Sequence, residues 1–178
     1  MDLNEIIIFL FLIIILLTAS VNDIRFHKIP NWLTYPAVVS AIVYHTAVNG
    51  LAGFFFSIKG IGVGIAVMII PYLMGGLGAG DAKLMGSVGG VLGPKNVFIA
   101  FLLSAIIGGL YAFTVLALHG CLKETISRYW IMVKTFFITK KFIYMPPSEA
   151  VEKLRLCYGL AISAGTLIFY CIWHFRNI

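Results

Sequence analysis

The sequence predicts an all-α membrane protein with six transmembrane helices, its N-terminus outside, and a basic amphipathic helix on the inner face. Three observations support this fold class. Hydrophobic residues make up 61% of the chain and charged residues only 11%, whereas soluble chains average about 45–50% apolar and about 25% charged residues. Long uncharged runs recur, and lysine and arginine gather in alternate connecting segments. This composition excludes a soluble enzyme and a disordered chain.

The gaps between charged residues mark the expected helices. A spanning helix needs about 17–25 mostly apolar residues, and we expect helices near 5–22, 31–48, 53–74, 81–94, 96–118 and 156–174. The fourth is the shortest, and a re-entrant helix is the alternative there. Asp2 and Glu5 precede the first run where a signal peptide would be basic, so we expect this run to be retained. Residues 1–178 would then form a single integral-membrane domain.

The distribution of basic residues predicts the orientation in the membrane. With the N-terminus outside, segments 22–30, 75–83 and 119–155 lie inside and hold ten of the 13 lysines and arginines. Cytoplasmic segments of membrane proteins carry such an excess. We therefore assign the net charge of +6 to an inner membrane face and not to nucleic-acid binding. The expected location is the cell (inner) membrane, with several passes through the lipid bilayer.

Segment 121–143 has a different pattern, in which basic residues lie largely between apolar residues at helical spacing. The apolar positions are Leu122, Ile126, Tyr129, Trp130, Val133, Phe136 and Phe137. This pattern predicts a basic amphipathic helix on the inner leaflet, ended by Pro146 and Pro147. A plain connecting loop is the alternative.

Two of the seven acidic residues are candidate catalytic groups. Asp23 closes the first predicted span and Asp81 opens the fourth, so the predicted topology puts both carboxylates at one depth on the inner side. Ionisable residues at such positions tend to face the bundle interior or a water-filled cavity. A helix-terminal role is the alternative for each of them: Asp81 as an N-cap, and Asp23 paired with Arg25 or Lys28.

Two neighbouring carboxyl groups in a site of low dielectric share one proton, because they cannot both ionise cheaply. The ionised partner takes a proton from water, and the protonated partner donates one to an amide carbonyl. The product is a tetrahedral gem-diol without an acyl-enzyme, as in aspartic proteases. Gly78 and Gly80 are expected to form the supporting turn of this site, since glycine adopts unusual φ/ψ values and admits a substrate backbone. For three later glycines we expect close helix packing: Gly86, Gly89 and Gly90.

The sequence lacks the residues that other catalytic mechanisms require. There is no HExxH motif, no CxxC pair and no GxSxG frame around Ser87. Packing or interfacial positions are expected for the four scattered histidines, His27, His45, His119 and His174. We therefore expect no metal and no other cofactor. The three cysteines form no disulfide framework: Cys121, Cys157 and Cys171.

With these residues in view, the chain resembles the type IV prepilin peptidases, which are GxGD-type aspartic peptidases of the membrane. Three stretches carry the resemblance: Asp23 with Arg25, Lys28, Ile29, Pro30 and Asn31; Gly78, Gly80 and Asp81 with Lys83 and Leu84; and Tyr158-Gly159-Leu160-Ala161-Ile162 with Gly165. The resemblance implies that Asp23 and Asp81 are the catalytic pair. It also implies that the substrate is a prepilin-like precursor with an apolar N-terminal helix, cut at the cytoplasmic face to release its short basic leader.

Long members of that family carry a domain with two CxxC pairs that is associated with methylating the new N-terminus. This sequence has no such pairs, so it resembles the short forms, and we expect cleavage only. Cys157 stands where the family often has proline. Two alternatives remain open: a small proton-coupled transporter or channel that uses Asp23 and Asp81 as a proton relay, and a non-enzymatic scaffold for pilus assembly that does not need these acids.

Overall fold

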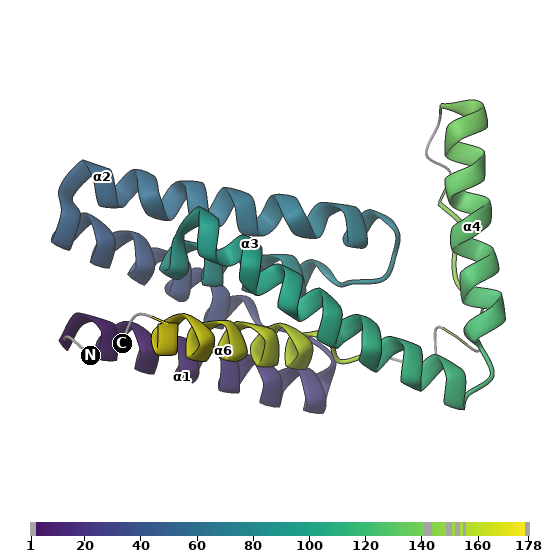
Figure 1. Ribbon diagram of the computed structural model, residues 1–178, viewed down its shortest axis with the longest axis horizontal. Helices are drawn as coiled ribbons and strands as arrows, with labels where there is room; N and C mark the ends of the chain where they lie inside the picture. Colours follow the sequence, from purple (N-terminus) through teal and green to yellow (C-terminus); the bar gives the residue numbers. More distant parts are fainter. Residues whose placement is uncertain (1–2, 141–143, 149–150, 152–153, 155, 177–178) are drawn as a thin grey trace.

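The computed structural model describes residues 3–140, 144–148, 151, 154 and 156–176, and this part of the chain contains helices and no strand. The prediction of an all-α fold is therefore confirmed. The helices are α1 (Leu3–Phe26), α2 (Asn31–Leu73), α3 (Ala79–Leu118), α4 (Leu122–Thr139) and α6 (Tyr158–Arg176). Figure 1 shows α1, α2, α3 and α6 lying side by side, with α4 running across one end of this bundle.

Helix α2 is broken at Gly50, where the chain reverses direction. The backbone of Gly50 has φ 60° and ψ −142°, which only glycine adopts easily. Beyond this residue the second half of α2 packs back on the first, since the Ser57 hydroxyl donates a hydrogen bond to the Ala41 carbonyl at 3.3 Å. The predicted helices 31–48 and 53–74 thus correspond to the two halves of α2, joined by a one-residue break.

Helix α3 has the same construction. Gly93 has φ 80°, and Pro94 follows it, so the helical hydrogen-bond pattern is interrupted here. Met85 before the break and Ser104 after it line one cavity, which requires the chain to fold back. The predicted helices 81–94 and 96–118 are the two halves of α3.

Small residues bring these half-helices into close contact. A Cβ atom on Gly60 would collide with the Gly89 carbonyl, and one on Gly64 with the Met85 carbonyl. Side chains of Ile65 and Ile61 lie directly on Gly86 and Gly90. The sequence-based prediction that the glycines at 86, 89 and 90 serve helix packing is therefore confirmed.

The outside of the bundle is apolar, as lipid contact requires. Large apolar side chains are exposed along every described helix. Among the described residues, three helices are long and apolar enough to cross a membrane: Ile6–Phe26 within α1, and all of α2 and α3. Tyr158–His174 is a shorter apolar helix. The protein is therefore a membrane protein.

The amphipathic segment differs in length from its prediction. Helix α4 ends at Thr139, because Lys140 adopts a left-handed conformation with φ 57° and its N–H donates to the Phe136 carbonyl. The helix thus stops well before the prolines expected to end it, and residues 141–143 of the predicted segment lie outside the described residues.

Candidate active site

Helix α1 ends, and helix α3 begins, at the end of the bundle opposite the chain termini (Figure 1). Asp23 is in the last turn of α1, and Asp81 is in the first turn of α3. Both side chains are buried, with 6% of Asp23 and 8% of Asp81 exposed. Their carboxylates are close enough to interact electrostatically. The structure therefore brings together the pair that the predicted topology placed at one depth.

Asp23 is fixed by the end of α1 and by the start of α6. Helix α1 stops because His27 takes a left-handed conformation, with φ 50°, and its N–H donates to the Asp23 carbonyl at 2.8 Å. One carboxylate oxygen of Asp23, Oδ2, accepts a hydrogen bond from the backbone N–H of Gly159 at 2.7 Å. The alternative pairing of Asp23 with Arg25 or Lys28 is absent among the described residues, where no such ion pair forms.

Glycine is required at position 159 because the Asp23 carboxylate lies directly on its Cα. An added Cβ atom would lie 2.9 Å from Asp23 Oδ2 and 3.2 Å from Asp23 Cγ. Real Cβ atoms essentially never approach another atom that closely. Any side chain at this position would therefore displace the Asp23 carboxylate or the start of α6.

Asp81 is fixed locally by the start of its own helix. Gly78 is the N-cap residue of α3, and Asp81 Oδ2 accepts a hydrogen bond from the Gly78 backbone N–H at 2.9 Å. A carboxylate in this position satisfies one of the free N–H groups of the helix end. The expected helix-terminal role of Asp81 is thus present, with Asp81 three residues inside the helix and not at the N-cap itself.

The glycines before Asp81 do not have the unusual backbone angles expected for them. Gly78 has φ −86°, and neither Gly78 nor Gly80 has a positive φ; the left-handed residue in this stretch is Gly75, with φ 73°. At Gly80 the requirement is space, since an added Cβ atom would lie 3.1 Å from the Ile29 side chain. The prediction of unusual φ/ψ values at these two glycines was wrong.

The stretches that contain the two aspartates are joined by polar contacts as well. Lys83 Nζ donates to Asn31 Oδ1 at 2.8 Å and lies 5.4 Å from the centre of the Tyr35 ring. The hydroxyl of Ser87 donates to the Thr34 carbonyl and to the Lys83 carbonyl. Ser87 therefore has a structural role, and the start of α3 is held against the start of α2.

Three further residues lie near the aspartates and had no predicted role in the site: His27, Cys157 and Tyr158. Cys157 Sγ lies 3.4 Å from His27 Nδ1. Burial, followed by the charges of Asp23 and Asp81, raises the pKa of the Cys157 thiol above its ordinary value, so the thiol is neutral at neutral pH. Tyr158 interacts electrostatically with Asp81. Tyr158 and Gly159 were noted in the sequence as part of the family resemblance. The contact of Gly159 with Asp23 could not be predicted from the sequence.

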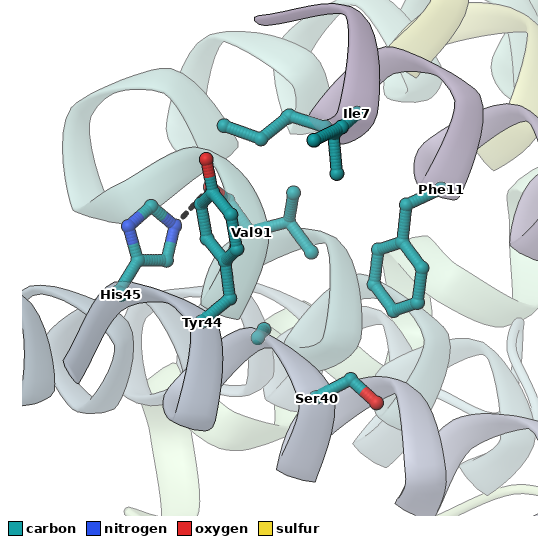
Figure 2. A pocket seen from close by; sticks show the side chains of 8 residues that line it. Ile7, Phe11, Ser40, Tyr44, His45 and Val91 are labelled. Carbon is teal, nitrogen blue, oxygen red and sulfur yellow. Dashed lines mark hydrogen bonds between the residues drawn. The ribbon is translucent and has the colours of Figure 1, made fainter. Parts of the chain in front are cut away.

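Other predicted packing residues lie elsewhere. Figure 2 shows His45 beside an apolar cavity of about 150 Å³ near the N-terminal end of α1, where its Nε2 lies 3.0 Å from the Val91 carbonyl. His119 Nδ1 lies 2.8 Å from the Val115 carbonyl. Within the described residues, no group of three or more His, Cys, Asp or Glu side chains could hold a metal ion.

The arrangement is suited to acid–base chemistry. Each aspartate has one oxygen anchored by a backbone N–H, and its second oxygen has no hydrogen-bond partner among the described residues. A fixed carboxylate with one uncommitted oxygen can hold a water molecule or a substrate carbonyl. Two such groups near enough to influence each other electrostatically can transfer protons in opposite directions.

Comparison with known proteins identifies a family that matches this chain. Residues 10–113 match the model of the type IV leader peptidase family. A curated relative, the prepilin leader peptidase/N-methyltransferase of Bacillus subtilis (strain 168), is 33% identical over 121 residues. The match covers 62% of this chain and 44% of the relative, so the chain spans less than half of that protein's length. No solved structure matches the chain.

Proposed function

The chain belongs to the type IV leader peptidase family, and we propose that it is a membrane aspartic endopeptidase that removes the short basic leader from prepilin-like precursors at the cytoplasmic membrane face. The observation that carries the proposal is the buried pair of Asp23 and Asp81 at one end of the bundle. The family match and the name of the curated relative support the substrate class.

In the proposed reaction Asp23 and Asp81 share one proton between them. The ionised carboxylate accepts a proton from a water molecule as the water oxygen attacks the scissile carbonyl carbon, and the other carboxyl donates its proton to the carbonyl oxygen. The resulting gem-diol collapses with cleavage of the C–N bond: the carboxyl that took the water proton donates it to the leaving nitrogen, and a hydroxyl of the diol returns a proton to the other carboxylate. No covalent intermediate with the enzyme forms.

The membrane would position the substrate for this step. The apolar helix of a precursor partitions into the bilayer while its charged leader stays in water, so the junction between them is held at the level of the aspartates. The membrane thus orients the substrate before it meets the enzyme, so that less entropy is lost when the two bind than in a soluble enzyme that must orient its substrate by contacts alone.

We also propose that each half of the two broken helices crosses the bilayer separately. The 43 residues of α2 would measure about 65 Å as one straight helix, about twice the thickness of the hydrocarbon core. Folded at Gly50 and Gly93, the two helices supply four spans, which with α1 and α6 make six. The basic excess then places the aspartates on the cytoplasmic side.

The test is cleavage of a co-expressed prepilin-like precursor, followed by its change in size on a gel. Asp23→Asn and Asp81→Asn keep the shape of the side chain and remove its acid–base chemistry, so we expect each to lower the cleavage rate by about 10²–10⁴-fold. Glu124→Gln is the matched control, because Glu124 is an exposed carboxylate on α4.

Each alternative function predicts a different result. A scaffold would tolerate both aspartate substitutions, and its precursors would mature normally. A proton-coupled transporter would produce no change in the size of any precursor. Membrane insertion of every variant is measured in parallel, so that loss of cleavage is not confused with loss of the protein.

A further inference from the structure

A polar cavity lies beside α4, and neither aspartate lines it. Its volume is about 240 Å³, and α4 lines it with Thr125, Arg128 and Tyr129. Gly75 and Gly76, in the turn between α2 and α3, form part of the opposite wall. Nothing in the proposed cleavage reaction uses this cavity.

The guanidinium group of Arg128 is the unusual feature of this cavity. Its Nε and Nη1 atoms are buried and have no hydrogen-bond partner in the described part of the chain. The guanidinium carbon lies 4.7 Å from the centre of the Tyr129 ring. A buried charge without a partner is costly, whereas a paired one is tolerated. The cavity therefore favours an anionic ligand with oxygen atoms that match the guanidinium fork.

An apolar cavity of about 390 Å³ adjoins the polar one along the same two elements. Its walls come from the end of α2 and from the next turns of α4: Ile70, Leu73, Met74, Met132, Val133, Phe136 and Phe137. One turn of α4 thus separates the positively charged group from a pocket lined by apolar side chains only. A ligand that fills both cavities has an anionic head and a hydrocarbon tail.

The surroundings of the two cavities identify the source of such a ligand. Helix α4 exposes large apolar side chains, with 70% of Trp130 and 74% of Phe137 exposed. It carries exposed basic residues as well, including Lys123 and Lys134. A helix of this kind lies at the surface of a bilayer, where it meets phospholipid headgroups. Basic pockets at this depth bind anionic headgroups.

We propose that these two cavities form a binding site for one anionic phospholipid, with its phosphate on Arg128 and one acyl chain in the apolar cavity. The phosphate pairs with the Arg128 guanidinium group, which must turn to present its buried Nε and Nη1 atoms to the cavity. The acyl chain lies between the end of α2 and α4. Bound lipid would hold α4 against the bundle at the end that carries Asp23 and Asp81.

The test measures thermal unfolding of the full chain in detergent as phosphatidylglycerol is added, with phosphatidylcholine as the zwitterionic reference. Phosphatidylglycerol should raise the unfolding midpoint saturably and by more than phosphatidylcholine does. Arg128→Gln should weaken the apparent affinity for phosphatidylglycerol on the order of tenfold to a hundredfold. Lys134→Gln removes the same charge from an exposed position of α4 and should bind like the wild type.

Three results would overturn the proposal. The first is equal affinity of wild type and Arg128→Gln, and the second is an equal loss in Lys134→Gln, which would indicate general surface attraction. The third is a stabilisation by inorganic phosphate alone as strong as that by the lipid. Should Arg128→Gln fail to fold, Arg128→Lys keeps the charge without the bidentate fork, and its affinity should still fall below that of the wild type.

Discussion

The two aspartates of the candidate site are held by opposite means. Asp81 accepts its hydrogen bond from a residue three positions earlier, within the start of its own helix, whereas Asp23 accepts one from a residue 136 positions later. The carboxylate of Asp81 therefore stays in place as long as α3 begins at Gly78. That of Asp23 depends on the position of a separate helix, α6.

The packing of α6 shows what controls Asp23. The Ser163 hydroxyl of α6 donates to the Leu16 carbonyl of α1 at 3.1 Å, and the Ser104 hydroxyl of α3 donates to the Ile162 carbonyl at 3.3 Å. These contacts fix the register of α6 against both neighbours. Asp81 is therefore positioned by local structure, whereas Asp23 reaches its position only in the folded bundle.

Among the substitutions that test this comparison, the largest expected effect is that of Gly159→Ala, which acts on Asp23 through space alone. Alanine favours a helix over glycine by about 1 kcal/mol, so the substitution suits α6 by itself. Its Cβ atom, however, would lie 2.9 Å from Asp23 Oδ2. The carboxylate must move by about half an ångström to restore an ordinary contact. Because a misplacement of about 1 Å can cost about 10²-fold, we expect kcat to fall about tenfold, with little change in KM. The measurement is the kinetics of precursor cleavage.

Two matched glycines separate this effect from a general cost of alanine. At Gly62 an added Cβ atom meets nothing within 4 Å, and at Gly78 it lies an ordinary 3.5 Å from Asp81 Oδ2. Alanine at either position should leave the cleavage rate within a few-fold of the wild type. If Gly78→Ala lost as much activity as Gly159→Ala, the distinction between a locally held and a remotely held aspartate would fail.

The same distinction explains how much the sequence could predict. The charge pattern placed Asp23 and Asp81 at matching helix ends, and the structure brings them together, because both lie where uncharged runs begin or end. The hydrogen bond from Gly159 could not be predicted, since it depends on the register of α6 against α1. The close approach of Ile29 to Gly80 could not be predicted either, because the two residues are distant in the sequence.

An intermediate effect is expected at the contact between Gly80, which precedes Asp81, and Ile29, which follows the end of α1. An added Cβ atom on Gly80 would lie 3.1 Å from Ile29 Cβ, so the neighbour must move by a few tenths of an ångström. We expect Gly80→Ala to destabilise the protein by about 1–3 kcal/mol and to slow cleavage several-fold. Chemical unfolding and cleavage kinetics measure the two effects.

The second variant for this contact is Ile29→Gly, which removes the Cβ atom that the new methyl group would meet. In the Gly80→Ala background it should recover part of the lost cleavage rate, although Ile29→Gly alone loses buried contacts. Such a coupling between the two substitutions is the signature of a direct contact. Strictly additive losses would show that Gly80 acts through some other neighbour.

The smallest expected effect is a change in the titration of Cys157, and it tests the geometry without any substrate. Burial is the largest cause of the raised thiol pKa, and the Asp23 and Asp81 carboxylates raise it further. A raised pKa leaves the thiol neutral until the pH exceeds its usual range, so alkylation at neutral pH should be slow. Removing either negative charge favours the thiolate. Asp23→Asn and Asp81→Asn should therefore each lower the thiol pKa.

The alkylation rate measured against pH gives this pKa directly, in a protein whose other two cysteines, Cys121 and Cys171, are replaced by serine. Asp23→Asn should cause the larger shift, since Asp23 is the stronger of the two electrostatic influences on the thiol. The thiol pKa should still remain above its ordinary value in both variants, because burial persists. A titration that responds to Asp23→Asn and not to Asp81→Asn would place Asp81 apart from the cluster, and the two aspartates could then not share a proton.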